Sequence, residues 1–128
     1  MCGASSSHLE GAIDQIRHLQ SDRHFRDRHK THYIEGARSF ISALDAGLKP
    51  RMMLVSKQLL KVPLAQKLVR QQRRAGVPCF SCSPETFRRV SQTQRASGIG
   101  AILPQHWSPL HQQQADCGLC WLVVERIN

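Results

Sequence analysis

The sequence predicts an α/β protein, a three-layer α/β/α sandwich in which helices cover both faces of a small sheet. Stretches with helical spacing of apolar residues alternate with short apolar or β-branched runs, an order that is typical of this class. The 128 residues are 41% hydrophobic, as in one globular domain. The run at 52–55 is apolar at every position, like a strand covered on both faces, so we expect about four strands, mostly parallel.

The amino-terminal part predicts a helix, a basic edge and a strand. The helix carries apolar side chains at spacings of three and four, on one stripe: Leu9, Ala12, Ile13, Ile16 and Leu19. Residues 23–30 have one apolar side chain in eight, so they form no buried face and we expect an exposed basic edge. Residues 32–35 have strand character, and Gly36 allows a sharp turn into a helix over 37–48.

The rest of the domain repeats the strand and helix pattern. The apolar run at 52–55 predicts a buried strand, and the spacing of apolar residues at 64–74 predicts a helix with a basic outer face. Residues 77–82 predict a third strand at a sheet edge, because Pro78 has no N–H to donate. Ser83 followed by Pro84 is typical of a helix start. Residues 98–103 predict the last strand.

The composition changes on either side of residues 9–104. Residues 1–8 predict a disordered polar leader without the apolar stretch of an export signal. Residues 105–118, rich in glutamine, proline and histidine, predict a linker. The apolar run that follows has no helix to cover it, so we interpret 119–128 as the first strand of a truncated second domain. No run approaches the roughly 20 residues that span a bilayer, so we expect no membrane partner.

The charge balance indicates a polyanionic partner. Lysine and arginine number 18 against 9 acidic residues, for a formal net charge of +9 and a pI near 10.1. No acid lies between Asp45 and Glu85, and a second basic cluster surrounds 23–32. A solvated charged face is the alternative. From these clusters we take as candidate phosphate-binding residues Arg23, Arg26, Arg28, Lys30, His32, Lys57, Lys61, Lys67, Arg70, Arg73 and Arg74.

Two aromatic residues lie in or beside the basic cluster at 23–32. Phe25 and Tyr33 are candidates for stacking on unpaired bases. Core packing is the alternative, and we favour it for Tyr33, because the chain has few aromatic residues to fill its core.

Other polar motifs predict no catalytic or metal site. The cysteine pairs at 79–82 and 117–120 lie much further apart than the roughly 15 to 20 residues of compact zinc ribbons. Cysteines three apart on a strand also face opposite sides of the sheet. A zinc or thiol protein remains the weaker alternative. For Glu35 we expect a capping role or a pair with a neighbouring arginine, and for Ser91 and Thr93 a role in turns. The odd number of cysteines, 5, favours a reduced, cytoplasmic setting.

Three short motifs resemble one family. The stretch 26–38, centred on Tyr33-Ile34-Glu35-Gly36-Ala37-Arg38, resembles the entry to the N-terminal RNA substrate-binding domain of SpoU (TrmH-like) RNA ribose 2′-O-methyltransferases. Ser91-Gln92-Thr93 and Gly98-Ile99-Gly100-Ala101 are similar to the end of that domain, although Val90 stands where the family usually has leucine. Arg38 closes the first motif and joins the candidate RNA-binding residues.

The resemblance implies a function as well as a fold. The fold would be similar to that of kink-turn-binding ribosomal proteins, and the partner would be structured RNA, either tRNA or rRNA. The family's catalytic motifs, which form a knotted S-adenosylmethionine site, have no match here, so we assign no catalytic or cofactor residue and expect that cofactor in a missing domain. A homodimer is implied for the full-length parent, and a monomer or weak dimer for this chain. A free-standing RNA-binding protein without enzymatic activity is the alternative.

Overall fold

The computed structural model describes residues 6–115 and 120–125. The described part of the chain contains, in order, α1 (Ser6–Ser21), α2 (Arg23–His29), β1 (Thr31–Glu35), α3 (Ala37–Asp45), β2 (Met52–Val55), α4 (Pro63–Arg74), β3 (Cys79–Ser81), α5 (Pro84–Val90), β4 (Ile99–Pro104) and the short 3₁₀ helix η1 (Leu110–Gln112). The predicted α/β class and the alternation of strands and helices are confirmed.

The strands form one mixed sheet in the order β1-β4-β2-β3. β2 and β3 are parallel, whereas β4 runs antiparallel to both of its neighbours, with His32 opposite Leu103 on one side and Met53 opposite Ala101 on the other. The prediction of a mostly parallel sheet is therefore wrong. After α5 and residues 91–98, β4 begins beside the end of β2, with Ile99 opposite Val55, so α5 does not serve as a crossover to the other end of the sheet. The chain re-enters from the edge at which β3 ends.

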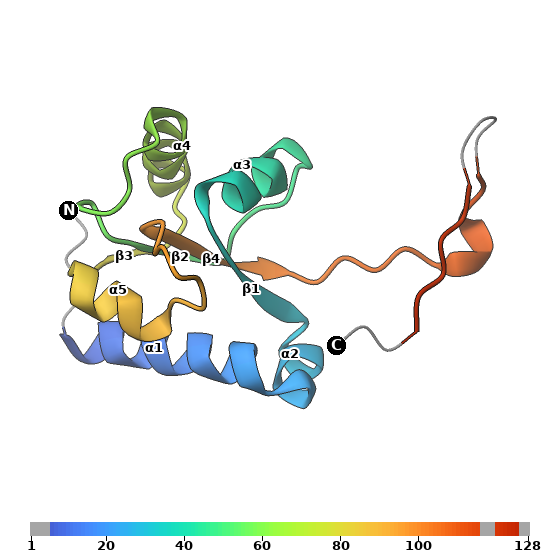
Figure 1. Cartoon of the computed structure of the whole chain (residues 1–128), viewed down its shortest axis with the longest axis horizontal. Coiled ribbons are helices and arrows are strands. Elements are labelled where there is room, and N and C mark those ends of the chain that lie inside the picture. The colour runs from blue at the N-terminus through green and yellow to red at the C-terminus, as the bar shows by residue number, and fades with distance from the viewer. Residues whose placement is uncertain (1–5, 116–119, 126–128) are drawn as a thin grey trace.

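Helices lie on both faces of this sheet, α1 and α5 on one and α3 and α4 on the other (Figure 1). Successive residues of β2 alternate between the two faces, as strand geometry requires. Met52 and Leu54 belong to an apolar cluster with α1 and α5, while Met53 and Val55 belong to a second cluster with α3 and α4. All four side chains are buried, which confirms that the apolar run is a strand covered on both sides.

Two glycines shape the edge of the sheet where β1 and β2 end and β4 begins. Gly36 has a φ of +111° and its N–H donates to the Ile99 carbonyl oxygen at 3.0 Å, so the predicted sharp turn between strand and helix is confirmed. Gly98 has a φ of +84°, and a Cβ there would overlap the backbone of Leu60. Both positions require glycine, because L-residues rarely adopt positive φ.

The ends of the domain differ from expectation. α1 begins at Ser6, so residues 6–8 are helical where a disordered leader was predicted; residues 1–5 lie outside the described residues. The basic edge is exposed, but residues 23–29 form the helix α2, capped by the Asp22 carboxylate, which accepts from the Phe25 N–H at 3.2 Å. Local capping thus forms a helix with no buried residue, which apolar periodicity does not detect.

The carboxyl-terminal segment is only partly described. Residues 120–125 belong to no helix or strand, and their side chains are exposed. Residue 119 and residues 126–128 lie outside the described residues, so a first strand of a second domain at 119–128 stays a prediction. Among the helices that the structure describes, none has both the length and the apolar character needed to cross a membrane.

Candidate nucleic-acid interface

The fold divides the candidate residues between two regions of the sheet, one beside β2 and α4 and one beside the start of β1. One group lies on α4 and at the edge where β1 and β2 end; we call it the α4 group: Arg38, Lys57, Lys61, Lys67, Arg70, Arg73 and Arg74. The other lies on α2 and at the start of β1, beside the end of β4; we call it the α2 group: Arg23, Arg26, Arg28, Lys30 and His32. The candidate residues predicted from the sequence therefore form two separate basic groups in the structure, and β4 pairs with a strand beside each of them.

Three residues of the α4 group line a hollow of about 340 Å³, which we call the Lys57 hollow. Buried apolar side chains contribute to its lining together with three cationic ones; the lining residues are Val55, Lys57, Leu60, Gln66, Val69, Arg70 and Arg73. The α4 members recur at spacings of three and four, so they share one helix face. The Gln66 side-chain amide donates to the Leu60 carbonyl oxygen at 2.7 Å and fixes this helix to the loop after β2.

The cations of the Lys57 hollow are not neutralised by the protein. No acid lines the hollow, and within residues 6–115 and 120–125 the ion pairs are Arg23 with Asp27 and Arg89 with Glu10. Arg73 and Arg74 occupy the last turn of α4, where the helix dipole favours positive charge. The hollow therefore presents lysine and arginine donors suited to a phosphate.

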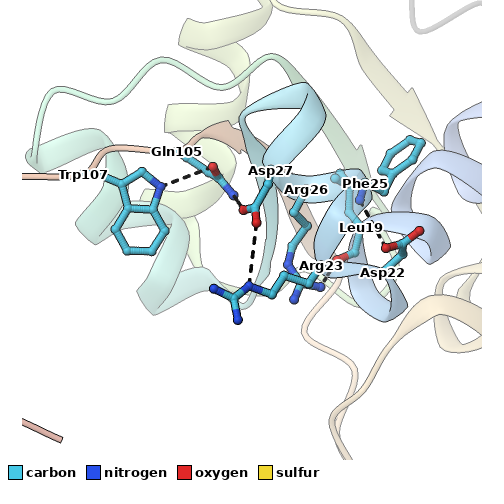
Figure 2. Close-up of polar contacts among 8 residues, drawn as sticks. All are labelled: Leu19, Asp22, Arg23, Phe25, Arg26, Asp27, Gln105 and Trp107. Carbon is cyan, nitrogen blue, oxygen red and sulfur yellow. Dashed lines mark hydrogen bonds and ion pairs between the residues drawn. The ribbon is translucent and has the colours of Figure 1, made fainter. Parts of the chain in front are cut away.

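The α2 group is engaged more within the protein. Arg23 pairs with Asp27 at 3.6 Å, and the Arg26 Nη1 donates to the Leu19 carbonyl oxygen at 2.7 Å, which satisfies the end of α1 (Figure 2). The Phe25 ring packs against the core and lies 5.2 Å and 4.2 Å, between centroids, from the rings of His18 and His29. Phe25 is therefore occupied by internal contacts.

A second hollow of about 290 Å³ lies beside the α2 group, and the sequence analysis missed most of its residues. Arg26, His32, Gln105, His106 and Trp107 line it; we call it the Trp107 hollow. Residues 105–107 had been assigned to the linker by composition. The signal that was available is the tryptophan itself, since a large aromatic ring in a polar linker is costly to leave in water without a partner. Burial lowers the pKa of His32 below its ordinary value, which favours its neutral form.

Glu35 has a structural role that joins two of the family-like motifs. Its Oε2 accepts hydrogen bonds from Ser91 Oγ at 2.9 Å and Thr93 Oγ1 at 2.8 Å, so the predicted pair with an arginine is wrong. The Thr93 N–H also donates to Ser91 Oγ at 3.3 Å, which confirms the turn role of these residues. Tyr33 packs against the core cluster of α1 and α5, as favoured from the sequence.

Cys82 is not an activated thiol. Burial raises the pKa of Cys82 to about 11, the opposite of the shift that makes a thiol reactive. Among the residues that the structure describes, no three histidine, cysteine, aspartate or glutamate side chains gather as metal ligands. Cys117, one half of the second cysteine pair, lies outside the described residues.

Solved structures with the same fold are methyltransferases. An AdoMet-bound rRNA methyltransferase from Sinorhizobium meliloti superposes with a TM-score of 0.67 at 20% identity over 84% of the chain. An RNA 2′-O ribose methyltransferase gives 0.65 at 25% identity over 82%, and the SpoU methyltransferase AviRb from Streptomyces viridochromogenes gives 0.63 at 18% over 82%. The chain covers 38% of each of these longer proteins.

Sequence comparison identifies the family. No curated protein matches the chain significantly. Residues 11–101, from within α1 to within β4, match the family model of the MRM3-like substrate binding domain. This match contains the three motifs around Glu35, Ser91 and Gly98 and the whole of the α4 group, and the chain belongs to the family of MRM3-like substrate binding domains.

Proposed function

We propose that this chain binds structured RNA, tRNA or rRNA, as the substrate-recognition domain of a SpoU-type RNA ribose 2′-O-methyltransferase, and that the α4 group holds the RNA backbone. The observation that carries the proposal is the Lys57 hollow, in which Lys57, Arg70 and Arg73 have no ion pair within the described residues. The family, and solved relatives that are an rRNA methyltransferase and an RNA 2′-O ribose methyltransferase, support RNA as the partner. Unneutralised cations attract the phosphates and release counterions when they bind.

The methyl donor, S-adenosylmethionine, belongs in this proposal to another domain of the parent protein. At Gly98 and Gly100, the glycines of the family-like motif, the protein fills the space itself: a Cβ at Gly98 would meet the backbone of Leu60, and one at Gly100 would meet the ring of Tyr33. We assign no catalytic or cofactor-binding residue to this chain. The parent would act as a homodimer in the cytoplasm.

Salt-dependent binding tests the role of the α4 group. The purified chain is titrated with a folded tRNA and with an rRNA hairpin at several salt concentrations, and the slope of log affinity against log salt is measured. We expect the double variant Arg70→Gln with Arg73→Gln to bind both RNAs more weakly. Its slope should be shallower by roughly 1.4 to 1.8, because each lost phosphate contact removes about 0.7 to 0.9.

The matched control removes the same charge from the opposite face of the sheet. Arg17 on α1 and Arg88 on α5 are exposed, and glutamine preserves helix propensity at all four positions. The variant Arg17→Gln with Arg88→Gln should keep the slope of the unmodified protein. If both double variants lose affinity and slope equally, net charge alone attracts the RNA and the assignment to the α4 group is wrong.

A further inference from the structure

The Trp107 hollow is built for something other than a phosphate. Its lining combines one exposed indole with an arginine, two histidines and a glutamine, and no acid. The exposed fraction of Trp107 is 80%, so its ring is open to solvent. The volume of about 290 Å³ is near the lower limit of small-ligand sites, so it suits a single base and not a longer stacked segment.

A chain of polar contacts fixes the position of the indole (Figure 2). The Trp107 Nε1–H donates to Gln105 Oε1 at 3.3 Å, and Gln105 Nε2 donates to Asp27 Oδ1 at 3.3 Å. The other carboxylate oxygen of Asp27 lies 3.6 Å from Arg23 Nε. The Gln105 backbone N–H also donates to the Lys30 carbonyl oxygen at 2.8 Å. The indole edge is thereby occupied, while the ring faces have no aromatic or cationic partner in the described residues.

We propose that the Trp107 hollow binds an unpaired RNA base, which stacks on the Trp107 ring beside Arg26 and His32. Every base has a π-face, so stacking on a fixed aromatic ring accepts any of them. The guanidinium of Arg26 donates through Nη1 to the Leu19 carbonyl oxygen and retains its other N–H donors. These donors and the positive charge are available to the phosphate next to the stacked base. The engaged carboxylate of Asp27 is held by Arg23 and Gln105. The proposal rests on RNA being the partner, but it concerns a hollow that shares no lining residue with the Lys57 hollow.

Tryptophan fluorescence tests the site directly, because the chain has 2 tryptophans. The variant Trp121→Phe keeps only Trp107, and the variant Trp107→Phe keeps only Trp121, which is also exposed. Each is titrated with a hexamer of uridines and, separately, with adenosine 5′-monophosphate. We expect saturable quenching of Trp107 and only linear, collisional quenching of Trp121. Saturable quenching of both, or of neither, overturns the proposal.

Affinity variants separate this site from the α4 group. Trp107→Ala should raise the Kd of the uridine hexamer about 5- to 150-fold, the range that corresponds to one stacked base, whereas Trp107→Phe should retain most of the affinity. The ring is exposed, so the substitution should leave the thermal melting temperature unchanged. Arg70→Gln with Arg73→Gln should not alter quenching by adenosine 5′-monophosphate.

The two proposals can fail independently. If folded RNA binding depends on the α4 group but Trp107→Ala leaves hexamer affinity unchanged, the base site is wrong and the proposed function stands. If Trp107 is quenched saturably but Arg70→Gln with Arg73→Gln leaves folded RNA binding unchanged, the base site stands and the role of the α4 group is wrong. If an unlabelled peptide with the sequence of residues 120–125 displaces the hexamer, the hollow is a docking site for the chain itself and the base proposal is overturned.

Discussion

Replacing Glu35 with alanine should destabilise the domain through two named contacts. Glu35 Oε2 accepts from Ser91 Oγ and Thr93 Oγ1 at 2.9 and 2.8 Å, and these bonds hold the end of β1 to the segment between α5 and β4. A hydrogen bond to a charged group contributes about 1.5 to 3 kcal/mol. Because Thr93 is exposed, we take the lower end and expect a coupling free energy of roughly 1 to 2 kcal/mol between Glu35 and Thr93.

A double-mutant cycle measures this coupling in the free energy of unfolding. Urea denaturation of the unmodified protein, Glu35→Ala, Thr93→Ala and the double variant gives the four values, and the cycle cancels the contacts that Thr93 makes elsewhere. Ser21→Ala serves as a control, because Ser21 Oγ donates within α1, to the Arg17 carbonyl oxygen at 2.9 Å, and shares no partner with Glu35. The changes in unfolding free energy caused by Glu35→Ala and Ser21→Ala should therefore be additive. A Glu35 to Thr93 coupling below about 0.5 kcal/mol, the usual limit of additivity, would refute the role of Glu35 as a clamp.

Three further predictions concern the core and its titratable groups. Gly100→Ala should lower stability by about 1 to 3 kcal/mol in urea denaturation, because its Cβ would overlap the Tyr33 ring. Gly11→Ala on α1, where the added Cβ meets nothing, should raise stability by about 0.5 to 1 kcal/mol. If Gly100→Ala were the more stable of the two variants, the close packing of Tyr33 on Gly100 would be contradicted.

Tyr33→Phe should leave stability unchanged or raise it, since the buried hydroxyl has no hydrogen-bond partner in the described residues. Burial raises the pKa of Tyr33, so the unfolded chain ionises first and the unmodified protein should lose stability above about pH 10. Tyr33→Phe should be less sensitive in the same alkaline titration. Burial lowers the pKa of His32, so the unfolded chain takes up the proton first and stability should fall as the pH drops below about 6.5. His32→Asn should show a smaller fall between pH 8 and pH 5.

Apolar periodicity predicted the elements that have a buried face, but it did not predict their directions. The strand at 52–55 and the start of α5 at Pro84, with its Ser83 cap bonded to the Thr86 N–H at 3.2 Å, match their predicted positions. α2 was missed because it is formed by polar contacts at its two ends, which leave no apolar stripe. The direction of β4 was missed because it depends on the end of the sheet at which the connection through α5 returns the chain, and a pattern of apolar residues does not indicate that end.

The part of the candidate site that depends on composition could be predicted from the sequence. The part that depends on contacts between segments far apart in the sequence could not. A long stretch without acids identified the α4 group, and the structure brings Lys57, Arg70 and Arg73 to one hollow. Trp107 was missed because its position follows from contacts between segments far apart in the sequence, above all Gln105 with Asp27. The composition of residues 105–118 predicts a linker, and only the pairing of β4 with β1 places the first of these residues beside α2.

The two hollows together restrict the kind of RNA that can occupy both. They lie beside different strands of one sheet, the Lys57 hollow beside β2 and α4 and the Trp107 hollow beside the start of β1, and β4 is buried between the two core clusters, so the fold sets their relative position. An uninterrupted duplex presents phosphates to the Lys57 hollow, but its bases are stacked and paired and cannot enter the Trp107 hollow. A single strand presents bases without a fixed backbone geometry. Under the two proposals, an RNA that fills both sites would combine a helical backbone with an unpaired base, as a hairpin loop or a helical junction does.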